Sequence, residues 1–171
     1  MALLDEQIVE EWLNSNGYFT IRGLRNGVRE IDLLAIKTNG ERFGSLQAEH
    51  LHVEVQISFN PIGYIGGNAN AAHRTDDLVK EGVIEYYNRK FNHPQIIDRR
   101  NRINLNADWQ YVLVHGVVIE PKELEYLKEL GVRVVSYKDV LNDLLANNNL
   151  SRTSSIATDI LKIVRYMREA D

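Results

Sequence analysis

The sequence predicts a mixed α/β fold in which helices cover both faces of one β-sheet. An Asn-Gly pair at positions 26–27 separates two strand-like runs, which is typical of a β-hairpin. Segments with helical spacing separate the later strand-like runs, and helical crossovers of this kind join parallel strands. The expected order is a helix, three strands, a helix, a strand, a helix, a strand and two helices.

The N-terminal half is expected to supply one helix, a hairpin and a third strand. Ile8 and Trp12 recur at helical spacing before the stop at Asn16-Gly17. The polar stretch Thr38–Glu49 is interpreted as a loop, and the Gly-rich stretch Asn60–Asn70 as irregular structure. The predicted elements are a helix at Leu4–Asn14, strands at Tyr18–Leu24, Val28–Lys37 and Leu51–Phe59, and a turn at Arg25-Asn26-Gly27.

In the C-terminal half, helices and strands alternate before a final helix. Pro121 in the first turn and Gly131 after the last turn bound one helix. The stretch Asn92–Asp108 is rich in Arg and Asn and is interpreted as a loop. The predicted helices are Ala71–Phe91, Pro121–Leu130, Tyr137–Ala146 and Thr153–Arg168, and the predicted strands are Trp109–Ile119 and Val132–Ser136.

Length, composition and charge restrict the possible functions. A chain of 171 residues matches one domain, here residues 1–146, followed by a linker and an amphipathic helix in 147–171 that packs on the domain or on a dimer partner. The absence of cysteine excludes disulfides and thiolate chemistry. The net charge of -4 means that nucleic-acid binding would need a local basic patch or a metal ion. The acidic N-terminus lacks the features of a signal peptide, so the expected location is the cytoplasm.

Two carboxylates lie on neighbouring predicted strands with apolar flanks. Asp32 lies on the second strand, and Glu54 and Gln56 project from the same face of the third. Burying two unpaired carboxylates would cost several kcal/mol each, and a bound divalent cation would remove that cost. Mg²⁺ prefers oxygen ligands of this kind. The pair therefore predicts a Mg²⁺ site that could act on a phosphodiester.

The sequence Glu30-Ile31-Asp32-Leu33-Leu34-Ala35 followed by His52-Val53-Glu54-Val55-Gln56 resembles the PD-(D/E)XK nuclease superfamily, and within it the small Holliday-junction-resolvase-like nucleases. The resemblance extends to the N-terminal helix, where Glu6 lies eleven residues before Gly17-Tyr18. It implies a restriction-endonuclease-like core with a C-terminal helical extension. It also implies a Mg²⁺-dependent DNA endonuclease, with Mn²⁺ as a substitute, that acts as a homodimer.

The same resemblance implies roles for individual residues. Asp32, Glu54 and the backbone carbonyl of Val55 would hold the metal ion, and Glu6 would be an accessory ligand. The superfamily usually carries Lys at the position of Gln56. Gln can orient the attacking water through its amide but brings no positive charge. Lys37, at the end of the second strand, is an alternative source of that charge, although strand alternation points it away from the face of Asp32.

Other interpretations of these residues remain open. Arg22 or Arg29 could neutralise Asp32 and Glu54 without any metal, and Glu6 could serve only as a helix N-terminal charge. His52 shares the strand face of Glu54 and could approach the site or be a structural residue. A catalytically inactive DNA- or protein-binding module on the same fold is the alternative to an enzyme. The candidate phosphate-contacting residues are Arg22, Arg25, Arg29, Arg99, Arg100 and Arg102.

Overall fold

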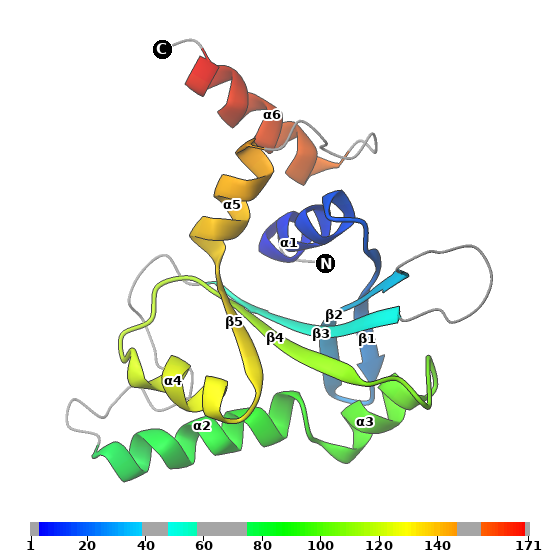
Figure 1. Cartoon of the computed structure of the whole chain (residues 1–171), viewed down its shortest axis with the longest axis vertical. Helices are drawn as coiled ribbons and strands as arrows, with labels where there is room; N and C mark the ends of the chain where they lie inside the picture. The colour runs from blue at the N-terminus through cyan, green and yellow to red at the C-terminus, as the bar shows by residue number, and fades with distance from the viewer. Residues whose placement is uncertain (1–3, 39–47, 58–74, 147–154, 170–171) are drawn as a thin grey trace.

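The computed structural model describes residues 4–38, 48–57, 75–146 and 155–169 (Figure 1). The helices are α1 (Leu4–Ser15), α2 (Asp76–Lys90), α3 (Pro94–Asn101), α4 (Lys122–Glu129), α5 (Tyr137–Ala146) and α6 (Ile156–Glu169). The strands are β1 (Phe19–Asn26), β2 (Arg29–Thr38), β3 (Ala48–Gln56), β4 (Trp109–His115) and β5 (Val132–Ser136). Within these residues, no helix has both the length and the apolar character needed to cross a bilayer.

The five strands form one mixed sheet in the order β1-β2-β3-β4-β5. The pairs β1/β2 and β2/β3 are antiparallel, whereas β3/β4 and β4/β5 are parallel. The predicted combination of a hairpin with helical crossovers is therefore confirmed. Helices cover both faces, with α1 and α5 on one side and α2, α3 and α4 on the other (Figure 1).

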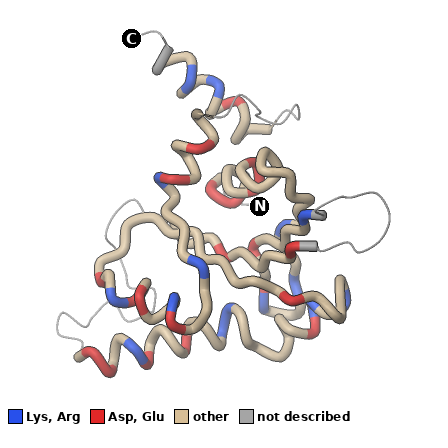
Figure 2. The backbone as a smooth tube through the Cα atoms, viewed as in Figure 1, with Lys and Arg blue, Asp and Glu red and all other residues tan. Residues whose placement is uncertain are grey.

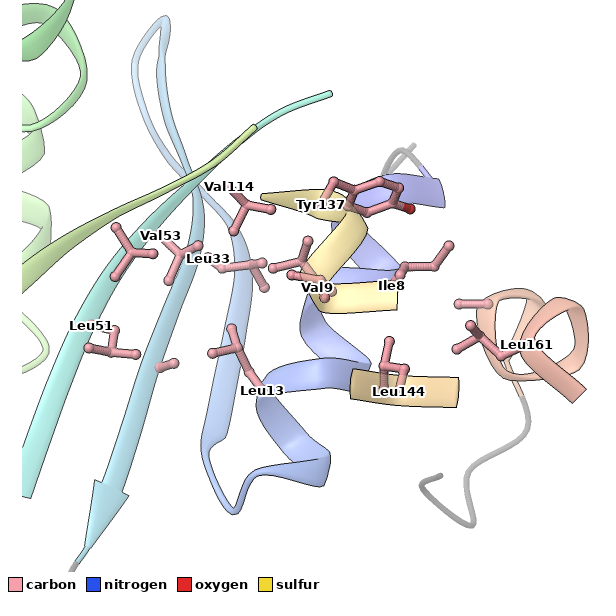
Figure 3. Close-up of a cluster of buried hydrophobic side chains, with 14 residues drawn as sticks. Ile8, Val9, Leu13, Leu33, Leu51, Val53, Val114, Tyr137, Leu144 and Leu161 are labelled. Carbon is pink, nitrogen blue, oxygen red and sulfur yellow. The ribbon is translucent and has the colours of Figure 1, made fainter. Parts of the chain in front are cut away.

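Alternation along β3 sends apolar and polar side chains to opposite faces of the sheet. Leu51 and Val53 join the largest hydrophobic cluster, next to α1 and α5 (Figure 3). His52 and Glu54 point to the other face, toward α2 and α3, and both are fully buried. The strand thus contributes to the core on one face and to a buried polar cluster on the other.

Helix α3 lies inside the segment that the sequence analysis interpreted as a loop. Its first residue is Pro94, and the ring of His93 accepts a hydrogen bond from the backbone N–H of Gln95. Ile96 is buried against β2, in a cluster with Ile31 and Leu34. The helix was missed because a short, strongly polar helix with few apolar positions shows no clear periodicity.

Several predicted boundaries also differ from the structure. Strand β1 extends to Asn26, which pairs with Arg29, so the turn consists of Gly27 and Val28. Gly27 has a φ of 62°, the left-handed conformation that the turn requires. Strand β4 ends at His115 rather than Ile119. Residues 58–74 and 147–154, which include parts of predicted elements, lie outside the described residues.

The final helix α6 packs on the domain through one face. Ala157 and Leu161 join the core cluster beside Ile8 and Leu144. Other apolar side chains of the helix are exposed, and these are Ile156, Ile163, Val164, Tyr166 and Met167.

Candidate functional site

Asp32 and Glu54 meet where strands β2 and β3 stop pairing. The antiparallel register ends at Leu33 opposite Val53, one residue before the two carboxylates. Beyond this point the Oδ2 atom of Asp32 accepts a hydrogen bond of 2.8 Å from the backbone N–H of Val55. The two carboxyl groups are close enough for the charge of Glu54 to raise the pKa of Asp32. The acidic pair predicted from the sequence is therefore brought together at the point where β2 and β3 stop pairing.

Each carboxylate oxygen of Glu54 has its own partner. Oε1 lies 3.0 Å from Nε2 of His52, and Oε2 is ion-paired with Nζ of Lys90, the last residue of α2. The Glu54 side chain is 1% exposed, whereas that of Lys90 is 31% exposed. The carboxylate is therefore buried, and the cluster borders solvent on the side from which Lys90 enters.

Burial dominates the electrostatics of the acidic groups. It raises the pKa of Asp32 to about 7, and the negative charge of Glu54 adds to this shift while Lys90 opposes it. Burial also raises the pKa of Glu54, against the nearby charge of Lys90. Although burial disfavours its charge, Lys90 has a raised pKa because Glu54 and Asp32 stabilise the ammonium. Lys90 therefore stays charged at neutral pH.

Glu6 of α1 approaches the same cluster. Burial, followed by the charge of Asp32, raises the pKa of Glu6 to about 7. The two groups therefore interact electrostatically, as an accessory position near the pair would require. Glu10, one turn further along α1, is instead ion-paired with Arg22 and accepts a hydrogen bond from Thr20.

Helix α2 places a second group beside the carboxylates. Tyr86 lies one helical turn before Lys90 and is 2% exposed, and its hydroxyl has no hydrogen-bond partner in the described part of the chain. Burial, then the charges of Glu54 and Asp32, raises the pKa of this hydroxyl well above its usual value. A buried hydroxyl without a partner is costly and stands out as a group available to a ligand.

Neither Gln56 nor Lys37 places a positive charge beside the acidic pair. Gln56 lies on the predicted face of β3 but is exposed to solvent. Lys37 lies away from the site, with its ammonium 5.4 Å from the centre of the Tyr18 ring. Lys37 therefore lies away from Asp32, as strand alternation predicted. Among the described residues, the ammonium paired with Glu54 belongs to Lys90, which sequence reasoning missed because it lies on a helix far from the motif.

The six candidate phosphate-contacting arginines do not form one surface group. Arg100 is only 4% exposed and bonds to His52, so its assignment as a surface phosphate contact is wrong. Arg22 is paired with Glu10, so it does not neutralise Asp32 or Glu54.

The remaining arginines differ in exposure. Arg25 and Arg102 are exposed in ion pairs with Glu30 and Asp98. Arg29 and Arg99 are partly buried. Basic and acidic residues are interspersed along the described elements in Figure 2.

The donor set suits an oxygen-liganded cation of small radius. Asp32 and Glu54 offer hard carboxylate oxygens, which Mg²⁺ prefers, and a backbone carbonyl and waters usually complete such a site. When both are ionised, the two carboxylates beside the single ammonium of Lys90 leave a net negative charge, which favours the binding of a cation. Among the described residues, no group of three or more His, Asp or Glu side chains is placed to hold a metal ion. The fit therefore rests on the acidic pair.

Comparison with known proteins does not identify a function for this chain. No protein-family model matches the chain, and no curated protein matches it in sequence. One crystal structure, of a protein of unknown function called AF1548, is similar with a TM-score of 0.46 and 14% sequence identity. The similarity covers 95% of this chain and 79% of that one. A likeness at this level does not assign a function.

Proposed function

We propose that this protein is a Mg²⁺-dependent endonuclease that hydrolyses phosphodiester bonds in DNA. The observation that carries the proposal is the ion pair between Lys90 and Glu54 beside Asp32. Two acidic residues and a lysine are the side chains expected at a PD-(D/E)XK site. Here the lysine comes from α2, while the motif position itself holds Gln56. A restriction-endonuclease-like arrangement of the sheet belongs to the same proposal.

In this proposal Asp32, Glu54 and the carbonyl of Val55 hold the metal ion, and Glu6 supports it from α1. The ion would lower the pKa of a bound water and neutralise charge on the phosphate. Lys90 keeps its ammonium charged at neutral pH, so it can contact a phosphate oxygen or orient the attacking water. The exposed amide of Gln56 lies on the solvent side of the same strand face and can hold a water.

A specific observation favours a second candidate, a catalytically inactive module that binds DNA or protein. Lys90 already neutralises Glu54 without a metal ion. In a protein that no longer binds a metal ion, this ion pair could stabilise the buried carboxylate of Glu54. The acidic pair would then be retained as a structural ion cluster.

A nicking assay on supercoiled plasmid in Mg²⁺ or Mn²⁺ separates the two candidates. The enzyme hypothesis expects nicking by the wild type, and losses of about 100-fold or more in Asp32→Asn and in Lys90→Met. Lys128→Met is the matched control, because it removes an exposed lysine of α4 far from the acidic pair. Metal-independent DNA binding without nicking would instead support the inactive module. Equal nicking by the wild type and Asp32→Asn would contradict the proposed site.

A further inference from the structure

A buried chain of hydrogen bonds leads from Arg100 through His52 to Glu54. Nη1 of Arg100 lies 2.9 Å from Nδ1 of His52, and Nε2 of His52 lies 3.0 Å from Oε1 of Glu54. All three side chains are enclosed, with exposed fractions of 4%, 0% and 0%. The chain connects α3 to the candidate site, although Arg100 itself is remote from Asp32 in sequence and element.

The chemistry of arginine fixes the direction of both bonds. A guanidinium group can only donate hydrogen bonds, so Nδ1 of His52 must accept. A neutral imidazole that accepts through Nδ1 carries its proton on Nε2. His52 therefore donates to Oε1 of Glu54. Arg100 sets the tautomer of His52, and that tautomer gives Glu54 a donor instead of a repelling lone pair.

Arg100 is itself held in place by surrounding aromatic residues. Its second nitrogen, Nη2, donates to the hydroxyl of Tyr111 at 3.3 Å, and its guanidinium lies 4.9 Å from the centre of that ring. Phe91 packs edge-on against His52 with ring centres 5.0 Å apart and stacks on Tyr111. The aromatic enclosure leaves little room for water to replace either hydrogen bond.

We propose that Arg100 and His52 are positioning residues for Glu54. They engage Oε1, so that Oε2, which pairs with Lys90, is the oxygen left for a metal ion. This role in metal binding rests on the proposed function above, whereas the tautomer of His52 does not. Groups that orient a metal ligand from behind commonly change metal affinity about 10- to 100-fold when they are removed.

The test combines histidine nitrogen NMR with Mn²⁺ titration on the full chain. We expect His52, assigned through a His52→Asn variant, to be the Nε2–H tautomer in the metal-free wild type. Arg100→Met should shift His52 toward the Nδ1–H tautomer and weaken Mn²⁺ binding about 10- to 100-fold. Arg100→Lys retains a donor and should restore most of the affinity. Arg99→Met, with the same change of charge on the neighbouring residue, should match the wild type.

The outcomes distinguish this inference from the proposed function. An Nδ1–H tautomer in the wild type, or unchanged Mn²⁺ affinity in Arg100→Met, would overturn the positioning role while leaving a metal site possible. Failure of the wild type to bind Mn²⁺, with His52 in the expected tautomer, would overturn the metal site and with it this role for the pair. If Arg100→Met does not fold, the His52→Asn variant made for the assignment replaces it, and we expect that variant to bind Mn²⁺ about 10-fold or more weakly than the wild type. An Mn²⁺ affinity in His52→Asn equal to that of the wild type would then overturn the positioning role.

Discussion

Glu54 is a charged side chain in a fully buried position, and each of its neighbours contributes to keeping it there. His52 donates to one oxygen and Lys90 pairs with the other. Asp32 takes the backbone N–H of Val55 instead, so its charge is less well compensated. Burial, with the charge of Glu54 adding to it, raises the pKa of Asp32 to about 7, so this residue should contribute to the pH dependence of stability.

We expect the metal-free protein to lose stability as pH rises toward 7 because of Asp32. Its folded-state pKa of about 7 lies above the usual aspartate pKa of 3.8, so the folded state holds a proton that the unfolded state has released. The stabilisation is complete below the unfolded pKa and is lost as pH rises through the folded pKa. One such proton corresponds to a slope of at most about 1.4 kcal/mol per pH unit.

Urea unfolding in EDTA between pH 4 and 8 measures this slope. Asp32→Asn should give a visibly flatter profile than the wild type. The raised pKa values of Glu6 and Glu54 act in the same direction, so a residual slope is expected in that variant. Superimposable profiles for the two proteins would show that Asp32 titrates normally in the folded state.

Glu54→Ala should abolish metal-dependent cleavage and lower the free energy of unfolding by about 1–3 kcal/mol. Loss of repulsion between the two carboxylates favours the variant. The larger effect is that Lys90 and the Nε2–H of His52 lose their partner in a buried site. A double-mutant cycle with Lys90→Met, measured by urea unfolding, should give a favourable coupling. Zero coupling would mean that the ion pair contributes nothing to folding.

At the level of elements, the sheet brings the acidic pair together and the helices on one face supply its cations. Helix α2 ends at Lys90 and presents Tyr86 one turn earlier, while α3 supplies Arg100. Both helices lie on the sheet face to which His52 and Glu54 point. The site is therefore assembled from α1, two consecutive strands and the two helices that follow them in the chain.

Moving the lysine from α2 back to the motif position tests this assembly. Lys90→Met should lose nicking activity, and Lys90→Met combined with Gln56→Lys should recover part of it, because a cation returns to the same strand face as Glu54. Gln56→Lys alone should fold normally, since Gln56 is exposed, and should cleave at least as well as the wild type. Plasmid nicking in Mn²⁺ gives the rates. Loss of activity in Gln56→Lys alone would mean that the amide makes a contact that an ammonium cannot replace.

Because α3 packs on the sheet through Ile96, we expect truncation of this side chain to destabilise the protein. Ile96→Ala should lower the free energy of unfolding by about 2–4 kcal/mol, because Ile96 is 1% exposed and packs on β2. Leu105→Ala, at an exposed position just beyond the helix, should change it by less than about 0.5 kcal/mol. Thermal or urea unfolding compares the two. Equal effects would indicate that this segment is not packed as a helix.

For the molecule as a whole, α6 is the helix that most suggests a further contact. It contacts α1 and α5 through Ala157 and Leu161, but other apolar side chains of the helix remain exposed. A stripe of this kind is unusual on a monomer and favours self-association. The homodimer expected from the sequence stays a prediction.

Sedimentation at micromolar concentration should give twice the monomer mass of 19.7 kDa. Ile163→Glu should shift the protein to the monomer, because it places a charge on the exposed stripe. Val28→Glu, at a turn position that is 95% exposed on the opposite end of the fold from α6, should remain dimeric. A wild type that sediments only as a monomer would remove the dimer prediction.

The sequence by itself determined the sheet, most of its elements and the acidic pair. Alternation in β3 and the Asn-Gly hairpin are local patterns, and local patterns define which face of a strand Glu54 occupies. The helix α3 was not predictable, since its stability comes from packing Ile96 on the sheet rather than from its own polar sequence. The charged groups around Glu54 become its neighbours only when the chain folds. Lys90 pairs with Glu54 directly and Arg100 acts on it through His52, from helices 36 and 46 residues further along the chain. Charge compensation across such separations leaves no periodic signal in the sequence.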